Sequence, residues 1–464
     1  MNPAMRRIAA VSLGAMGFLA VWLTFQQVTA GSTYSDDPRN VRALGDTDDD
    51  RRGIITTAEG IVVAEDVEGI RSYPEGTTYF HLVGYAAADF STALESTRAG
   101  DLRSLDDGSI TSWLITLFGG SVEPPEVRLT VVDRIQQVAA RELEGLTGAI
   151  VAVEPATGAV LAYASSPAAD PNDLVSGEIT LEEHLKDRAA LDRVAFRLLP
   201  SGSAFKVLVA AAALESGMTP ETELEDSAEY LAPGAGQPIV NVSGGRCSGG
   251  NEISLSDALA VSCNTVFASI AVELGGAVIN EIAERAGFNR VLPFELGAAV
   301  SSIPSAGDLS ADEGALAQTG LGERDLRVTP LQMAVIAAGI GNGGMMMQPY
   351  VVDSVLTRDG SKLSGTSAKQ LGRVMDGATA ADLTAMMAAV VSGGTGRATA
   401  RADVTVAGKT GTAEGSGGPH AWFIAFAPAE QPTIAIVVMI EGGGSGGSIA
   451  APIAARVLDA WFQR

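Results

Sequence analysis

A serine and a lysine three residues apart, Ser203-Ala-Phe-Lys206, give this sequence its first chemical signal. Pro200 and Gly202 interrupt the chain just before them, and residues 204–216 are rich in helix formers, so we expect Ser203 at a helix N-terminus. Positions i and i+3 share one face of a helix, which predicts that the Lys206 amine lies beside the Ser203 hydroxyl. A serine becomes nucleophilic when a neighbouring base takes its proton, and a desolvated lysine is neutral often enough to be that base. Taken alone the pattern is weak, because a surface serine beside a solvated lysine is its usual explanation.

Two further short motifs follow along the chain, and each occurs once. Residues 262–264 read Ser-Cys-Asn, which sets a hydroxyl and an amide two residues apart where both can face one cleft. Residues 409–412 read Lys-Thr-Gly-Thr at the end of a predicted strand, where side-chain alternation puts Thr410 and Thr412 on one face. Gly411 between them allows a substrate backbone to approach closely.

The elements expected around these motifs predict one sheet built from both ends of a long domain. Apolar runs at 149–153 and 159–163 are joined by turn residues and predict a β-hairpin. Three more strands are expected at 404–412, 421–427 and 433–440, and helices at 204–216, 256–274, 330–338 and 449–462. Strands at both ends with helices between them indicate a single α/β sheet covered by helices.

A boundary between two domains is expected at 119–125, where a Gly-Gly pair and a Pro-Pro pair interrupt regular structure. Residues 29–125 would form a smaller, mixed β-rich N-terminal pedestal domain and its linker, with a strand at 53–63. Residues 126–464 would form the second domain, whose first helix is expected to open with a capping box at Thr130–Asp133.

The N-terminus predicts a membrane anchor. Residues 8–25 carry no charge, which is close to the shortest length for a transmembrane helix, and Arg6 and Arg7 precede them. We therefore expect residues 1–7 in the cytoplasm, a signal-anchor at 8–28, and the remaining chain on the extracytoplasmic side of the cell membrane. A cleaved signal peptide ending near Val28–Ala30 and a buried core helix remain as alternatives.

Charge and cysteine content restrict the possible functions. With 31 Lys plus Arg against 55 Asp plus Glu, the net charge of -24 repels polyphosphate, so we expect no nucleic-acid partner. The three histidines and two cysteines show neither zinc-ligand spacing nor a CxxC pair, and no metal is expected. In an exported domain Cys247 and Cys263 form a disulfide or stay as two buried thiols.

Two glycine-rich patterns imitate known motifs. Residues 339–344 fit GxGxxG but follow a predicted helix rather than a strand, so we interpret them as a helix stop and loop. Residues 443–447 fit GxSxG but lie in a glycine-rich loop without a nearby His and Asp. We expect both to be structural.

The order SxxK, SxN and KTG is that of penicillin-binding proteins and serine β-lactamases. The sequence resembles class B penicillin-binding proteins, in particular the PbpA-type peptidoglycan D,D-transpeptidases, over nearly its whole length. Further segments that carry this resemblance are 52–54, 73–76, 81–85, 152–159, 329–334 and 420–424. The resemblance implies that the second domain has a serine β-lactamase-like fold, with an antiparallel five-stranded sheet flanked by helices, and needs no cofactor.

The resemblance also implies a role for each motif residue. Ser203 would attack the penultimate D-alanine carbonyl of a peptidoglycan stem peptide with Lys206 as base, and Ser262 and Lys409 would relay a proton to the leaving amine. β-Lactam antibiotics would acylate the same serine.

The remaining motif residues would bind substrate. Asn264 would hold the substrate amide, and Thr410 and Thr412 would hold its terminal carboxylate. The backbone N–H groups of Ser203 and Thr412 would form the oxyanion hole.

Two positions depart from the family pattern. Gly322-Glu323 stands where Gly-Gln is usual and adds a negative charge near the expected path of an anionic substrate. Ser201 stands where proline is usual before Gly-Ser. Neither change removes a catalytic group.

Three alternatives to a transpeptidase remain open: a D,D-carboxypeptidase, a β-lactamase, and a non-catalytic penicillin-binding sensor or scaffold. The intact motifs disfavour a pseudoenzyme, and no dedicated deacylating carboxylate is identifiable. Because no glycosyltransferase domain fits before residue 126, the resemblance implies a partner that polymerises glycan, a SEDS-family glycosyltransferase in the membrane.

Overall fold

The computed structural model describes residues 16, 18, 19, 22, 51–87, 90–103, 123–186 and 188–463. The chain divides into two units, Met1–Arg51 and Arg52–Arg464. In the first unit residues 16, 18, 19 and 22 are helical and exposed, and the rings of Phe18 and Trp22 stack at 6.4 Å. The predicted anchor therefore lies mostly outside the described residues.

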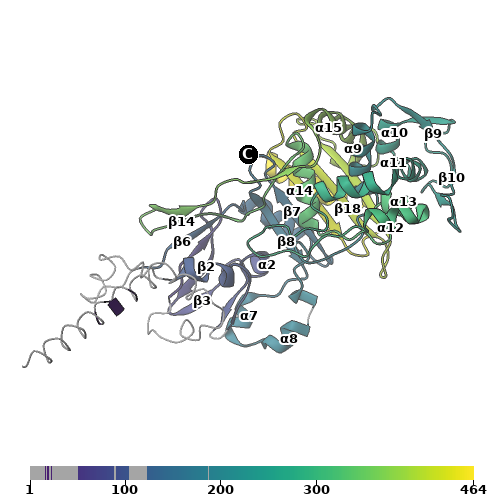
Figure 1. The fold of residues 1–464 in the computed structure, drawn as a ribbon. Helices are drawn as coiled ribbons and strands as arrows, with labels where there is room; N and C mark the ends of the chain where they lie inside the picture. The colour runs from purple at the N-terminus through teal and green to yellow at the C-terminus, as the bar shows by residue number, and fades with distance from the viewer. Residues whose placement is uncertain are drawn as a thin grey trace, which may run out of the picture. The chain divides into compact units, whose positions relative to one another are not determined.

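The centre of the second unit is a five-stranded antiparallel sheet in the order β17-β18-β19-β7-β8 (Figure 1). Its strands are β7 (Gly148–Val153), β8 (Val160–Ser166), β17 (Ala407–Ala413), β18 (His420–Ala427) and β19 (Ile434–Ile440). The expected fold class and the assembly of one sheet from both ends of the domain are confirmed.

Helices bury both faces of this sheet, which explains why its central strands are apolar without interruption. One core includes Ile150, Phe423 and Val438 and lies under α6 (Asp133–Glu142) and α16 (Ala450–Phe462). The other includes Val151 and Val437 and packs against α14 (Pro330–Gly341).

The remaining helices surround the second core. They are α9 (Lys206–Glu215), α10 (Leu255–Ala260), α11 (Asn264–Arg285), α12 (Ala306–Ala311), α13 (Glu313–Gly320) and α15 (Gly377–Ser392). In the part of the chain that the structure describes, α11 is the one helix long and apolar enough to cross a membrane. Its apolar residues include Val266, Phe267 and Ile270, which are buried in the domain core, so we interpret α11 as a core helix.

A second sheet has the order β15-β14-β6-β1-β2-β3. Its strands are β1 (Ile55–Thr56), β2 (Val62–Val67), β3 (Ile70–Ser72), β6 (Glu126–Leu129), β14 (Val352–Leu356) and β15 (Lys362–Gly365). Residues 352–365 thus pair with the N-terminal region through β6. The domain boundary near residue 125 remains a prediction.

Three local predictions were wrong. The helix expected at 256–274 is divided into α10 and α11, because a turn that holds Ser262 at φ +62° separates them. The strand expected at 53–63 is a hairpin of β1 and β2, which turns where Gly60 has φ +83°. The expected capping box does not form, because α6 begins at Asp133 without a side-chain cap and the Thr130 hydroxyl donates to the Val160 carbonyl at 2.7 Å. A distant strand therefore takes the hydroxyl that the local motif assigned to the helix.

Short elements complete the second unit. The helices are α2 (Phe80–Val83), α3 (Ala93–Thr97), α4 (Ala99–Leu102), α7 (Pro171–Ser176) and α8 (Leu181–Lys186). The strands are β4 (Ala86–Ala87), β5 (Phe90–Ser91), β9 (Glu223–Glu225), β10 (Glu229–Tyr230), β11 (Ile239–Val240), β12 (Glu252–Ser254), β13 (Met345–Met347) and β16 (Gln370–Arg373). Single 3-10 turns lie at η2 (Gly76–Tyr79), η3 (Arg188–Ala190), η4 (Gly202–Phe205) and η5 (Arg397–Thr399).

A buried ion network fixes the N-terminal region. Glu95 has a fully buried side chain and accepts from Arg52 Nε at 2.8 Å and from Arg71 Nε at 2.6 Å. Arg71 also contacts Asp66 at 3.0 Å, and the Tyr73 hydroxyl donates to Glu95 at 3.2 Å. Because every charge in this cluster has a partner, the carboxylate can be buried without an isolated charge in the core.

Candidate active site

Ser203 lies in the 3-10 turn η4, directly before α9 begins at Lys206. This turn packs closely on β17. Gly202 has φ +53°, and a Cβ there would meet the Thr412 carbonyl oxygen at 2.2 Å. A Cβ at Gly411 would meet the Ser201 carbonyl oxygen at 2.4 Å. The space next to Gly411, which the sequence assigned to a substrate backbone, is therefore occupied on this side by the protein's own turn.

Lys206 is fully buried beneath the serine. Its Nζ donates to the Ser262 carbonyl and to Asn264 Oδ1, both at 2.8 Å, and it lies 3.4 Å from Ser262 Oγ. Desolvation lowers the pKa of Lys206 far below its usual range, and the charge of Lys409 lowers it further. Among the described residues the Ser203 hydroxyl has no hydrogen-bond partner, so the expected contact between Ser203 and Lys206 is not a hydrogen bond in this structure.

Lys409 reaches Ser262 from the sheet. Its Nζ donates to Ser262 Oγ at 2.8 Å and to the Thr410 carbonyl at 3.0 Å. Complete burial lowers the pKa of Lys409 to about 7. The Ser262 hydroxyl therefore lies between two buried amines, both of which are easily deprotonated.

Ser262 is held in a strained conformation, with φ +62°. It occupies the short turn between α10 and α11, so its backbone is fixed by both helices. The structure thus brings together Ser262, Lys206 and Lys409 from three distant parts of the sequence.

Asn241, which the sequence did not single out, fixes the start of α11. Its Oδ1 accepts from the backbone N–H of Asn264 at 2.9 Å and of Thr265 at 3.0 Å, and its side chain is buried. The side-chain Nδ2 of Asn264 in turn donates to the Val240 carbonyl at 3.0 Å. Asn241 lies more than 20 residues before the helix that it caps, so no local sequence pattern links the two. The sequence analysis missed it for this reason.

A disulfide joins Cys247 to Cys263, whose Cα atoms are 5.8 Å apart. Asp226 anchors the same loop by accepting from the backbone N–H of Cys247 at 2.9 Å and of Ser248 at 2.6 Å. Asp226 and the two sulfurs lie within 4.8 Å of one another, but cysteines in a disulfide are not thiolate ligands. We therefore interpret this cluster as a structural tether between residue 247 and the SxN motif.

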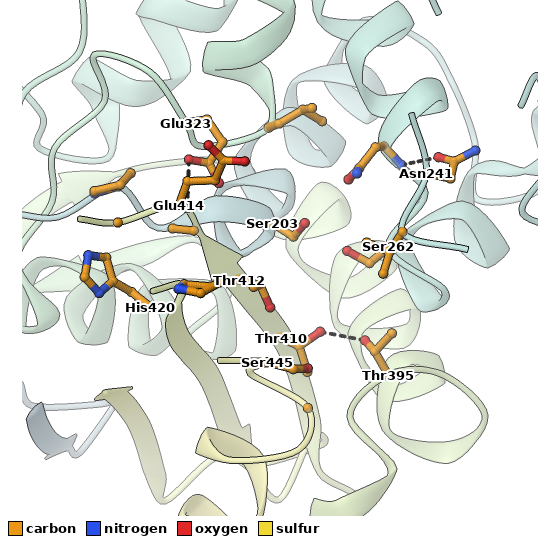
Figure 2. Close-up of a pocket in the computed structure, with 18 of the residues that line it drawn as sticks. Ser203, Asn241, Ser262, Glu323, Thr395, Thr410, Thr412, Glu414, His420 and Ser445 are labelled. Carbon is orange, nitrogen blue, oxygen red and sulfur yellow. Dashed lines mark hydrogen bonds between the residues drawn. The ribbon is translucent and has the colours of Figure 1, made fainter. Parts of the chain in front are cut away.

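The other end of the site is rich in hydroxyl groups. Thr410 Oγ1 and Thr395 Oγ1 share a hydrogen bond at 2.7 Å, and Thr412 Oγ1 accepts from the Gly446 N–H at 3.2 Å. Ser445 also lines the cleft (Figure 2). The glycine-rich loop at 443–447 therefore contributes to the site, although its GxSxG pattern predicted only a structural role.

These groups face one cleft of 1420 Å³. Ser203, Ser262 and Asn264 line it together with Thr410 and Thr412. The two lysines lie below its surface and are completely buried. A serine hydroxyl that lines a cleft above two buried lysines with lowered pKa values is an arrangement that can activate the serine for attack on an acyl group.

Glu323 also lines this cleft, so the departure from the family pattern falls in the site itself. Its carboxylate accepts from the backbone N–H of Glu414 at 3.4 Å. Burial raises the pKa of Glu323 to about 7, and the neighbouring Glu414 charge adds to this effect. In Figure 2 these two carboxylates lie on one side of Ser203 and the hydroxyl groups of Thr395, Thr410 and Ser445 on the other.

The fold and the site together define a serine acyltransferase with a buried lysine pair. Residues 148–459 match the family model described as the penicillin binding protein transpeptidase domain. The chain belongs to this family, and its predicted recognition as a class B penicillin-binding protein is confirmed.

The chain is similar over its whole length to peptidoglycan D,D-transpeptidases named PbpA. It is 34% identical to the protein from Mycolicibacterium smegmatis, with 98% of this chain and 97% of the relative covered. It is also 34% identical to the Mycobacterium tuberculosis protein, over 100% of this chain and 99% of that one.

Solved structures show the same likeness. The penicillin G acyl-enzyme complex of penicillin-binding protein A from M. tuberculosis has a TM-score of 0.82 and 33% identity, over 89% of this chain and 100% of that chain. The D,D-transpeptidase domain of an Eggerthella lenta protein has a TM-score of 0.80 and 31% identity, over 89% and 98%.

Proposed function

We propose that Ser203 is the nucleophile of this protein, which is a peptidoglycan D,D-transpeptidase that β-lactams acylate. The activity follows from the family and from similarity to PbpA over the whole chain. The single observation that supports the residue assignment is the Lys206–Ser262–Lys409 network below the cleft that Ser203 lines.

In the first half-reaction Lys206, as the neutral amine, takes the Ser203 proton while Oγ bonds to the penultimate D-alanine carbonyl carbon. The bond from that carbon to the terminal D-alanine nitrogen then breaks. Ser262 gives its proton to the leaving amine, and Lys409 replaces it through the 2.8 Å hydrogen bond. Lysines with lowered pKa suit this transfer, because each holds its proton weakly near neutral pH.

Substrate is held by the groups around this centre. The terminal carboxylate binds Thr410 and Thr412, and the Asn264 side chain holds the peptide amide. The backbone N–H groups of Ser203 and Thr412 receive the developing oxyanion, an arrangement whose loss typically reduces the rate by about 10²- to 10³-fold. In the second half-reaction the amine of another stem peptide replaces Ser203 Oγ on the carbonyl carbon and forms the cross-link.

The protein acts at the outer face of the cell membrane, anchored by residues 8–28, with residues 1–7 in the cytoplasm. Domains 29–125 and 126–464 serve as pedestal and transpeptidase. A glycan polymerase of the SEDS family is the proposed membrane partner. The membrane proposals rest on the apolar run at 8–25 and on the two arginines before it, and the proposed polymerase partner rests on the resemblance to class B penicillin-binding proteins.

Intact mass spectrometry of the full-length protein in detergent with benzylpenicillin tests the nucleophile. We expect one stable adduct that is absent in Ser203→Ala. Rapid drug hydrolysis would instead indicate a β-lactamase, and the absence of both adduct and hydrolysis would indicate a non-catalytic scaffold.

A further inference from the structure

Hydroxyl groups and carboxylates lie at opposite ends of the cleft. The end with the carboxylates has no function in the mechanism above. Thr395, Thr410 and Ser445 provide hydroxyl groups at one end, and Glu323 and Glu414 provide carboxylates at the other. The donor peptide ends in a carboxylate. This group can accept hydrogen bonds from the hydroxyl groups at one end of the cleft and is repelled by the glutamates at the other. The carboxylate end therefore favours a substrate group of opposite charge.

Glu323 is held close to the nucleophile by the backbone. The N–H of Gly202, the residue before Ser203, donates to the carbonyl of Gly322, the residue before Glu323, at 3.0 Å. A Cβ at Gly322 would meet the Gly202 carbonyl oxygen at 2.1 Å, so the two segments are in tight contact. The Glu323 charge raises the pKa of Lys206, and the Lys206 charge lowers the pKa of Glu323, which agrees with this closeness.

The Glu323 carboxylate is half-buried yet has no cationic side-chain partner in the part of the chain that the structure describes. The nearby arginines are engaged elsewhere. Arg324 pairs with Asp312 and Asp325, and the Arg327 guanidinium donates to the carbonyls of residues 324 and 326. A desolvated carboxylate that has no ion-pair partner favours binding of a cation from the substrate.

We propose that Glu323 is the acceptor-binding residue of the transpeptidase, which receives the protonated amine of the second stem peptide and takes one of its protons. This inference rests on the proposed function. The ammonium R–NH₃⁺ transfers a proton to the carboxylate and becomes R–NH₂, and the Glu323 proton then passes to solvent. The neutral nitrogen bonds to the acyl carbon, and the bond from carbon to Ser203 Oγ breaks. Lys206 returns to Oγ the proton that it took in the first half-reaction, and the second nitrogen proton passes through Ser262 to Lys409, which restores the starting state.

Other titratable groups around Glu323 agree with this role. Glu414 raises the pKa of Glu323, whereas Arg327 and Lys206 lower it. Burial lowers the pKa of His420, which lines the same cleft, and so favours the uncharged form of this ring. A carboxyl group with pKa about 7 is well matched to accept a proton from an amine near neutral pH.

The test separates the two half-reactions in the full-length protein. Benzylpenicillin acylation reports the first, and the ratio of cross-linked to hydrolysed product, from a D-alanyl-D-alanine pentapeptide and an amine-bearing tripeptide, reports the second. Glu323→Gln should acylate within about twofold of the parent, while the acceptor KM rises about tenfold or more, as expected for loss of a charged hydrogen bond. Glu323→Asp should restore part of the ratio, and Glu430→Gln, an exposed site with the same charge change, should leave it unaltered.

Two further readouts decide the assignment. An N-acetylated tripeptide should not compete in the parent, and the rise through pH 7 of the ratio of cross-linked to hydrolysed product should disappear in Glu323→Gln. An unchanged product ratio in this variant would overturn the proposal, as would a selective loss of hydrolysis, which would assign Glu323 to water. Absence of acylation in the parent protein itself would instead refute the proposed function, and the acceptor site with it.

Discussion

Lys409 Nζ lies 2.8 Å from Ser262 Oγ, although the two residues are 147 positions apart in the sequence. The contact connects the edge strand β17 to the turn between α10 and α11, and Lys206 approaches the same serine residue from below Ser203. The proposed proton transfer therefore depends on the sheet and the helical part of the domain keeping their relative position.

Replacement of Lys409 tests this relay. Lys409→Met removes the amine but keeps a flexible side chain of similar length in a fully buried position. We expect penicillin acylation to slow by about 10²-fold or more, as is typical when a positioned proton-transfer group is lost. Stopped-flow acylation kinetics measure this, with exposed Lys362→Met as control. An acylation rate within a few-fold of the parent would assign Lys409 to structure alone.

Stability should also depend on pH through Lys409. Its pKa is about 7 in the folded protein against 10.5 ordinarily, so between these values the unfolded chain binds the extra proton. The free energy of unfolding therefore increases as pH rises from about 7 to 10, and Lys409 adds at most about 1.4 kcal/mol for each pH unit. Urea unfolding at pH 7, 8 and 9 should show a steeper increase for the parent than for Lys409→Met. Equal slopes would show that the burial of Lys409 does not shift its pKa.

Asn241 should act as a positioning residue for the SxN motif. Asn241→Ala removes the acceptor for the N–H groups of Asn264 and Thr265, and loss of a helix cap costs about 1 kcal/mol. We expect slower acylation in addition, because Asn264 is no longer held against Lys206. Asn241→Asp keeps the acceptor oxygens and should recover part of the rate. If both variants acylate at the parent rate, Asn241 stabilises the fold only.

Glu95 should affect stability without affecting chemistry. Glu95→Ala leaves Arg52 and Arg71 without their shared carboxylate, and breaking such a buried pair typically costs about 3–5 kcal/mol. Denaturant unfolding measures the loss, with the exposed Glu182–Lys186 pair as the control through Glu182→Ala. The acylation rate of the folded fraction should not change, and a large decrease in it would show that the N-terminal region supports the site.

The sequence predicted most of the domain that carries the site. The sequence predicted β19 and α14 at nearly the observed bounds. Long apolar runs mark such strands, and caps or breakers mark such helices, because periodicity and turn residues are local signals. The hairpin of β7 and β8 was found for the same reason. The split of 53–63 into two strands was missed, since a short strand and a tight turn leave little periodic pattern.

The three motifs also predicted the central residues of the site. Their order along the chain predicted the protein family. Several other residues of the site were missed or misjudged. Asn241 has no motif, and Ser445 belongs to a pattern that suggested only a loop. Glu323 was noticed as a departure, but its place in the cleft depends on the contact between residues 202 and 322.

The sequence by itself determined the chemical groups available to this protein: a serine at a helix start, two lysines, a hydroxyl–amide pair and the strand that carries KTG. The tertiary structure decided what that chemistry becomes. Burial is what lowers the pKa of Lys206 and Lys409, and the joining of Cys247 to Cys263 required two Cα atoms at 5.8 Å. Both depend on how segments far apart in the chain pack together, because desolvation and proximity are properties of the folded core and not of any local stretch of residues.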